Sequence, residues 1–195
     1  MKKLLVTGFD PFGGQSVNPA WEAVSELPDV IGNYAVMKLQ VPTVYGLAAQ
    51  TALKTAEELK PDTIVCIGQA GGRPKVTPEV IGINLRDASI PDNAGAKPWN
   101  EPIVPDGADA LFSTLPVHEM VEKAQKRGLP CALSYSAGAF VCNDLLYTLL
   151  HHYRGTDTRV GFIHVPFLPS QTDEKTPSLP LETITQTLIC LLESV

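Results

Sequence analysis

The sequence predicts an α/β fold, a single three-layer α/β/α domain over residues 1–195 with a mainly parallel central sheet. Short β-rich runs alternate with helical stretches along the chain, and this alternation is typical of parallel sheets covered by helices. The nearly continuous apolar run "DTIVCIGQ" at 62–69 indicates a strand that is buried on both faces. No repeat or linker divides the chain, and its 195 residues fit one domain of roughly 100–200 residues.

Before that central run, the first part of the chain supplies two more strands and two helices. Lys3–Gly8 is a short β-rich run, and Tyr34–Val41 alternates as a strand does. Pro19–Leu27 is predicted to be helical, with a proline in its first turn. Thr43 occupies the position of an N-cap before a long helix, whose apolar residues recur at helical spacing until Pro61 ends it.

The second half continues the alternation around a long loop. Val80–Leu85 is a strand candidate, and the segment from Ile90 to Gly107 is rich in Pro, Asp, Asn and Gly, which predicts a loop. Loops of that length in compact domains are often functional. The remaining predictions are helices at Val117–Arg127, Phe140–Tyr153 and Leu181–Glu193 and strands at Cys131–Ser134 and Val160–Val165.

The composition excludes several classes of function. A net charge of −6 and the lack of a basic cluster disfavour nucleic acid binding, which needs grouped Lys and Arg. The apolar run after the first lysines is too short for a secretory leader, and no segment has the roughly 20 apolar residues of a membrane span. We therefore expect a cytoplasmic protein. Its four cysteines are widely spaced without a CxxC pair, which predicts neither disulfides nor a metal site.

Cys142 is the first candidate for chemistry. It follows the predicted strand "CALSYS" and the small-residue turn "AGA", in or near the first turn of a helix. Free N–H groups and the helix dipole lower the pKa of a thiol at such a position, and the same N–H groups stabilise an oxyanion. The alternative is a small apolar residue that packs one face of the helix.

His164 and Glu79 are the other two candidates. His164 ends the run "RVGFIHV" just before a proline, at the carboxyl edge of the sheet, where a general base is useful. Glu79 begins an otherwise apolar stretch, and a carboxylate there could orient the histidine. A histidine satisfied by a neighbouring carbonyl and a solvated edge carboxylate are the alternatives. None of the three signals is specific alone, but together they supply a nucleophile, a base and an orienting acid.

The glycine-rich turn "GFDPFGG" after the first strand raises a competing interpretation, nucleotide binding. It does not fit G-x-G-x-x-G, and the later turn "GQAGGRP" lacks the Lys-Ser/Thr ending of a phosphate-binding loop. Nucleotide binding is therefore the weaker interpretation.

Seven separated segments resemble the pyrrolidone-carboxylate peptidases, also called pyroglutamyl peptidase I, which are cysteine peptidases that remove N-terminal pyroglutamate. They are "GFDPFGG", "NPAWEAV", "QVPTVYG", "GQAGGR", "INLRDASIPDN", "SYSAGAFVCN" and "GFIHVPF". Their order and spread over nearly the whole chain make the resemblance highly specific.

The resemblance implies Cys142 as nucleophile, His164 as base and then acid, and Glu79 as the orienting residue. It also implies an α/β/α fold, no cofactor, a cytoplasmic location, a homotetramer, and peptides with N-terminal pyroglutamate as substrates. Its substrate pocket is implied to consist of Phe9, Phe12, Gln69, Ile90 and Val141. Flat phenylalanine walls suit a small neutral lactam ring, although both rings could instead cap the core under a loop.

Two positions depart from the usual family pattern. Val80 stands where an arginine usually follows the catalytic glutamate, and Ser89 replaces the arginine of "DARIPDN". These changes motivate an alternative function, a catalytically weakened protein that still binds pyroglutamate or another cyclic amide.

Overall fold

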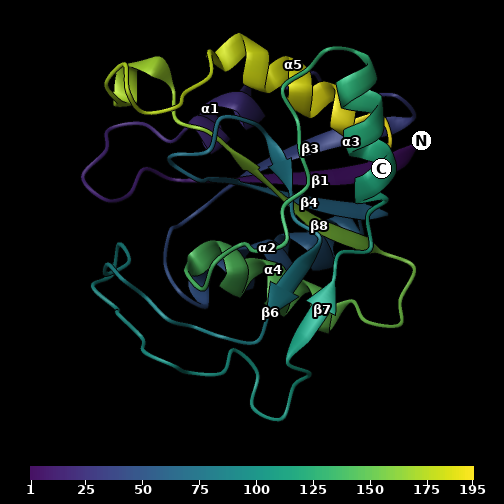
Figure 1. Ribbon diagram of the computed structural model, residues 1–195. Coiled ribbons are helices and arrows are strands. Elements are labelled where there is room, and N and C mark those ends of the chain that lie inside the picture. The colour runs from purple at the N-terminus through teal and green to yellow at the C-terminus, as the bar shows by residue number, and fades with distance from the viewer.

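The computed structural model describes residues 1–195 and has the predicted α/β architecture (Figure 1). The strands of its central sheet are β1 (Lys2–Phe9), β2 (Val30–Ile31), β3 (Tyr34–Val41), β4 (Thr63–Gln69), β5 (Thr77–Pro78) and β8 (Arg159–Val165). The helices are α1 (Pro19–Ser25), α2 (Leu47–Leu59), α3 (Val117–Lys126), α4 (Val141–His152) and α5 (Leu181–Leu192), with a 3-10 turn η1 (Pro169–Gln171). None of these helices has the length and apolar character that crossing a membrane requires.

The central sheet has the strand order β2-β3-β1-β4-β8-β5. Its four long strands run parallel, whereas the two-residue edge strands β2 and β5 pair antiparallel. The prediction of a mainly parallel sheet is therefore confirmed. The carboxyl ends of β1, β4 and β8 lie along one edge, and Gly68 of β4 is in register with His164 of β8. Ligands of open parallel sheets bind beyond this edge.

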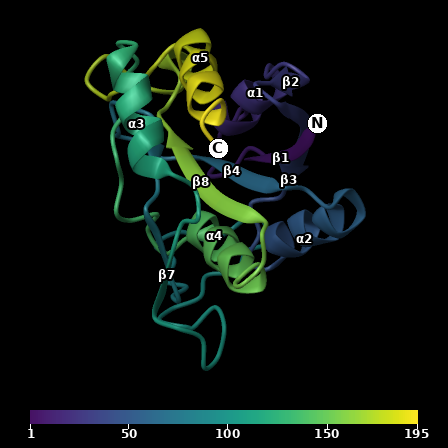
Figure 2. The ribbon, with the colours of Figure 1, turned by 90° about the vertical axis from the view of Figure 1, so that its right-hand side faces the viewer.

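Two hydrophobic clusters, one on each face of the sheet, join the three layers. Helices α1, α3 and α5 cover one face, and α2 and α4 cover the other (Figure 2). Strand β1 contributes Leu4 and Val6 to the first cluster and Leu5 to the second. Because neighbouring side chains of a strand point to opposite faces, burial on both faces gives an uninterrupted apolar run in the sequence.

Helix α1 begins at an asparagine that also borders the site edge. The Asn18 Oδ1 atom accepts a hydrogen bond of 3.0 Å from the N–H of Ala20, and Pro19 occupies the first helical position, where its missing N–H costs nothing. The Asn18 amide nitrogen donates to the carbonyl of Asp10 over 2.9 Å. This cap fixes the connection from β1 to α1.

Two of the predicted strands differ from the structure. Cys131–Ser134 is no regular strand, since only isolated bridges join Cys131 and Ser134 to the segment beside them. Pro78 in that segment has no N–H to donate, so a continuous ladder cannot form. The predicted strand Val80–Leu85 shortens to β6 (Ile81–Ile83), which pairs outside the central sheet with β7 (Ala110–Phe112), a strand too short to be predicted.

The predicted N-cap at Thr43 is also wrong, because α2 starts at Leu47 with Gly46 at its N-cap. Thr43 is held by Asp10 instead. The Asp10 Oδ1 atom accepts hydrogen bonds of 2.7 Å from both the N–H and the hydroxyl of Thr43. The turn after β3 is thereby tied to the turn after β1, and the helix begins a few residues later.

The predicted long loop is present between β6 and β7 and is fastened to the same edge of the sheet. The Asp92 carboxylate accepts hydrogen bonds from the N–H groups of Tyr45 (2.9 Å) and Ala96 (2.8 Å). The Asn93 amide donates to Asp10 Oδ1 (3.3 Å), and the Asn93 N–H donates to the carbonyl of Thr43 (3.0 Å). Three connections that are distant in the sequence therefore meet at Asp10.

Helix α4 is anchored by a buried ion pair two residues after Cys142. The fully buried Asp144 carboxylate accepts from Arg86 Nε (2.6 Å) and from the N–H of Gly46 (2.8 Å). The neighbouring Asn143 binds the main chain of Ile83 through both ends of its amide. These contacts fix the first turn of α4 against the chain that leaves β6 and against the start of α2.

Replacing Asp144 by Ala should destabilise the fold by about 2–4 kcal/mol, because it leaves the Arg86 guanidinium and the Gly46 N–H without their partner. Urea unfolding of the two proteins measures this difference in the free energy of unfolding. The control is Glu122→Ala, which removes an exposed i,i+4 pair with Lys126 and should leave the midpoint nearly unchanged. Equal midpoints for Asp144→Ala and the wild type would contradict the anchoring role.

Candidate active site

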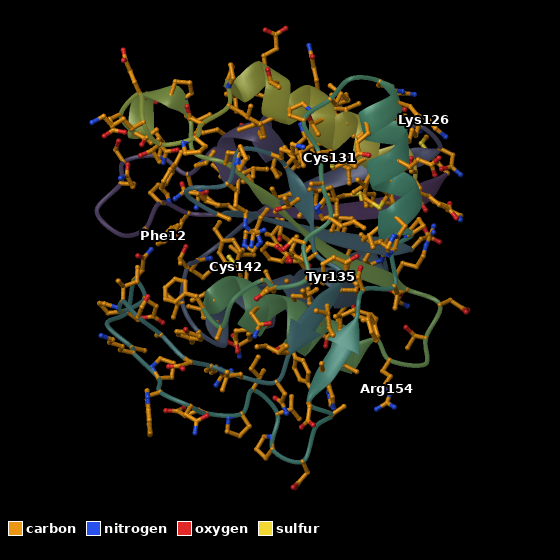
Figure 3. The ribbon with its side chains drawn as sticks, in the orientation of Figure 1. Phe12, Lys126, Cys131, Tyr135, Cys142 and Arg154 are labelled. Carbon is orange, nitrogen blue, oxygen red and sulfur yellow. The ribbon has the colours of Figure 1, made fainter.

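A pocket of about 370 Å³ opens beyond the carboxyl ends of β1, β4 and β8. Its walls combine three phenylalanines with polar side chains, and both Cys142 and His164 line it. Figure 3 shows Cys142 at the end of α4 that faces the loop carrying Phe12. The pocket therefore lies at the edge where the sequence placed its candidate residues.

Cys142 is the second residue of α4 and lies partly buried. No side chain caps the start of this helix, so its first N–H groups remain free to bind a ligand oxygen. The sulfur occupies space that a side chain at position 68 would fill. A Cβ atom on Gly68 would lie 2.9 Å from Cys142 Sγ, so only glycine leaves room for the thiol there.

The pKa of the Cys142 thiol is raised to about 12, first by burial and then by the negative charge of Glu79. This corrects the sequence-based expectation of a lowered pKa. The Arg73 charge and the N–H of Cys142 do act in the expected direction, but burial outweighs them. At neutral pH Cys142 is therefore a protonated thiol, and it would need a general base to remove its proton before acting as a nucleophile.

His164 is buried at the end of β8 and is oriented by Glu79. Its Nδ1 atom lies 2.7 Å from Glu79 Oε1, and its ring packs against Phe162 at a centroid distance of 4.7 Å. The carboxylate accepts the Nδ1 proton, which leaves Nε2 as the unprotonated atom of the neutral ring. Burial lowers the pKa of His164, and the raising influence of Glu79 only partly offsets this. The imidazole is thus uncharged at neutral pH, the state in which a histidine can accept a proton.

Glu79 is completely buried, which excludes the solvated edge residue considered as an alternative. Burial would raise the pKa of its carboxyl, but the hydrogen bonds with His164 and Arg73 and the charge of His164 lower that pKa below its ordinary value. Arg73 Nη1 is 2.7 Å from Glu79 Oε1, so the carboxylate has a cation beside it. Glu79 therefore stays ionised and keeps His164 in one tautomer.

Arg73 was not among the predicted site residues. It lies in the turn "GGRP" after β4, and its second guanidinium nitrogen donates to the carbonyl of Ser136 over 2.9 Å. An arginine in a glycine-rich turn is usually expected to be exposed to solvent. Its spacing from Glu79 in the sequence does not indicate that the two side chains are in contact. The cation and carboxylate come together because β5 folds back antiparallel onto β8.

Aromatic rings form the apolar part of the pocket. Phe9 is 2% exposed at the end of β1, and the Phe12 ring lies 6.0 Å from the ring of Phe140. Phe140 in turn contacts Tyr45 edge to face at 5.5 Å. The turn "GFDPFGG" thus supplies two of the three phenylalanines, and the third comes from the residue before α4.

The structure places three of the five expected substrate residues in this pocket, namely Phe9, Phe12 and Gln69. Ile90 is 44% exposed on the long loop, and Val141 is fully buried in α4; neither is among the lining residues. The lining side chains that were not predicted include Asn18, Thr43, Arg73 and Phe140.

A protein-family model described as pyroglutamyl peptidase matches residues 2–195 of this chain. The chain belongs to the pyroglutamyl peptidase family. The pyrrolidone-carboxylate peptidase of Enterococcus faecalis is 49% identical over 196 residues, covering 98% of this chain and 92% of that protein. The structure of pyroglutamyl peptidase I from Bacillus amyloliquefaciens superposes with a TM-score of 0.95 at 45% identity, covering 100% of this chain and 96% of that one. A pyrrolidone carboxyl peptidase from Thermococcus litoralis also reaches a TM-score of 0.95, at 35% identity, and covers 100% of this chain and 93% of its own.

The family resemblance drawn from the seven sequence segments is thereby confirmed. Of the two departures from the family pattern, Val80 is an apolar core residue, 8% exposed, and Ser89 is exposed on the long loop. The cation that contacts the Glu79 carboxylate in this pyroglutamyl peptidase family member is Arg73. A positive charge therefore lies beside the carboxylate even though Val80 replaces the usual arginine. No group of three or more His, Cys, Asp or Glu side chains is arranged to hold a metal ion.

The acid limb of kcat/KM for a pyroglutamyl arylamide should lie below pH 6.5. His164 must be neutral to accept the thiol proton, and burial lowers its pKa from the ordinary value of 6.5, so the neutral ring persists to lower pH. Because Glu79 raises the pKa of His164, Glu79→Gln should move the limb to still lower pH and reduce kcat on the order of 10²- to 10⁴-fold. A stopped assay over pH 4–9 measures the position of the acid limb and the fall in kcat. An acid limb above pH 6.5 in the wild type would contradict the assignment of His164 as the base.

Proposed function

We propose that this chain is a cysteine peptidase that cleaves the bond after an N-terminal pyroglutamate, with Cys142, His164 and Glu79 as its catalytic residues. The observation that carries the proposal is the 2.7 Å contact between Glu79 and His164 at a pocket that Cys142 also lines. A nucleophile, a neutral base and an ionised orienting group are the parts that a thioester mechanism needs. Membership of the pyroglutamyl peptidase family supplies the substrate class.

Acylation begins with proton transfer from the Cys142 thiol to His164 Nε2. The thiolate attacks the carbonyl carbon that joins pyroglutamate to the next residue, and the carbonyl oxygen takes up the negative charge. The free N–H groups in the first turn of α4 are suited to stabilise this oxyanion. When the intermediate collapses, the C–N bond breaks and His164 returns its proton to the departing amine, leaving a thioester on Cys142.

Deacylation repeats these steps with water. His164 takes a proton from water, the hydroxide adds to the thioester carbonyl, and the C–S bond breaks as the thiol regains a proton. Glu79 keeps its charge throughout and stabilises the imidazolium that forms in both halves of the reaction. The chemistry requires no cofactor.

The pocket suits a neutral five-membered lactam. Phe9, Phe12 and Phe140 provide flat apolar surfaces, and Gln69 adds an amide. No acidic side chain lines the pocket, so a free α-ammonium group would lose its hydration without gaining a counter-charge. This favours a blocked, cyclised N-terminus over an ordinary one. The weakened binding protein remains the alternative function, but no observation favours it.

We further propose that residues 1–195 form one catalytic domain that works in the cytoplasm as a homotetramer, as the family resemblance implies. Size-exclusion chromatography with light scattering gives the mass of the assembly directly.

Cys142→Ser should lower kcat for a pyroglutamyl arylamide by at least about 10³-fold, because a hydroxyl is far less acidic and less nucleophilic than a thiol. Chromophore release by the wild type and the variant measures the ratio. Cys66→Ser is the matched control, since Cys66 is a buried thiol of β4 outside the lining of the pocket. The folded fraction of the Cys66→Ser protein should keep the wild-type kcat. Equal rates for Cys142→Ser and the wild type would overturn the mechanism.

Phe12→Ala should raise KM for pyroglutamyl substrates about tenfold while kcat changes little, because it removes ring contact that ground state and transition state share. Phe112→Ala is the control: Phe112 is 70% exposed on β7 and lies outside the pocket, so its KM should not move. An unchanged KM in Phe12→Ala would count against the apolar wall.

A further inference from the structure

Gln171, at the end of η1, makes three hydrogen bonds that link separate parts of the site edge. Its Oε1 accepts from the N–H of Leu168 (2.9 Å), and its Nε2 donates to the carbonyl of Val17 (3.3 Å). The same Nε2 donates to Gln69 Oε1 over 3.0 Å. Gln171 is outside the lining of the pocket, whereas Gln69 is part of it.

The polarity of the main chain fixes which way the Gln171 amide points. A main-chain N–H can only donate and a main-chain carbonyl can only accept. If the Gln171 amide turned over, its NH₂ would face the N–H of Leu168 and its oxygen would face the carbonyl of Val17. Both contacts would become repulsive, so the orientation with Nε2 toward Gln69 is the stable one.

This orientation determines what Gln69 presents to the pocket. Because the Gln171 Nε2 group is a donor, it must meet the oxygen of the Gln69 amide. The Gln69 Nε2 group is then left on the other side of the amide, and no residue of the chain accepts a hydrogen bond from it. Since Gln69 lines the pocket at the end of β4, this N–H is a donor that the side chain can offer to a ligand.

We propose that Gln171 is a positioning residue that holds the Gln69 amide with its N–H toward the pocket, and so makes the site select a ring that carries a carbonyl acceptor. The inference rests on the proposed function, since the carbonyl in question is that of the pyroglutamate lactam. A proline-like ring lacks this oxygen and leaves the donor without a partner. Sites built around a buried hydrogen-bonding group discriminate strongly against ligands that lack its partner.

Gln171→Glu keeps the shape of the side chain and reverses its donor toward Gln69. A carboxylate at position 171 still accepts from the N–H of Leu168, but it has no proton to donate to Gln69 or to the carbonyl of Val17. The Val17 contact is lost in Gln171→Met as well, so comparing the two variants isolates the effect on Gln69. The Gln69 amide then turns over, donates its NH₂ to the carboxylate and offers its oxygen to the pocket. We expect KM for a pyroglutamyl arylamide to rise at least about tenfold, with kcat within about threefold of wild type.

Two further variants separate orientation from mere stability. Gln171→Met has neither donor nor acceptor, so it frees the Gln69 amide without turning it, and its KM should rise only about threefold. Gln125→Glu is the matched control, because Gln125 Nε2 also donates to a main-chain carbonyl, that of Cys131, over 3.0 Å, but neither residue lines the pocket. It should leave KM unchanged. The inhibition constant of 2-pyrrolidone should follow KM in all four proteins.

The rate of Cys142 alkylation by iodoacetamide reports whether each variant keeps an intact site. The KM values and the 2-pyrrolidone inhibition constants are compared only among variants whose Cys142 is alkylated at the wild-type rate. If Gln171→Glu does not fold, Gln171→Met and the 2-pyrrolidone constants carry the test. A KM within twofold of wild type in both variants, or a fall in kcat at constant KM, would overturn the role of Gln171. A wild-type chain without any pyroglutamyl arylamidase activity would instead overturn the proposed function itself.

Discussion

The site depends on a charge that has no access to water. The Glu79 side chain is fully enclosed, and a buried carboxylate is stable only when cations or hydrogen-bond donors surround it. Here Arg73 and His164 both meet the same oxygen, each at 2.7 Å. Arg73 holds the charge in place, and the charge holds the imidazole. The turn after β4, the edge strand β5 and the end of β8 must all be assembled before any one of these groups has its partner.

Much of the fold was predictable because a strand that is buried on both faces of the sheet appears in the sequence as a continuous apolar run. Strands β1, β4 and β8 are apolar runs, and the helices between them carry apolar faces, so their existence and order followed directly. The errors arose where a tertiary contact decides the local structure. Asp10 takes the N–H of Thr43 and delays the start of α2, and Pro78 interrupts the ladder that would have made Cys131–Ser134 a strand. Strands of two or three residues leave too short a pattern to detect.

The candidate site also has features that the sequence could predict and features that depend on tertiary contacts. Cys142, His164 and Glu79 could be chosen because each has an unusual chemical type for its position on a predicted element. The thiol pKa could not be predicted, since burial and the Glu79 charge oppose the helix dipole and their balance depends on three-dimensional distances. Arg73 and Gln171 act through other side chains, and nothing in their own sequence surroundings distinguishes them from solvated residues.

The hydrogen bonds that meet at Asp10 affect how readily a ligand enters the pocket. Asp10 joins the turn that carries Phe12, the turn that carries Thr43 and the loop that carries Asn93, so hydrogen bonds within the chain fix the two turns that line the pocket. A ring that enters finds its contacts in place and loses little further conformational entropy from the protein. The same rigidity limits the pocket to flat rings about as thick as a five-membered lactam. A thicker group would require the three connected segments to move together.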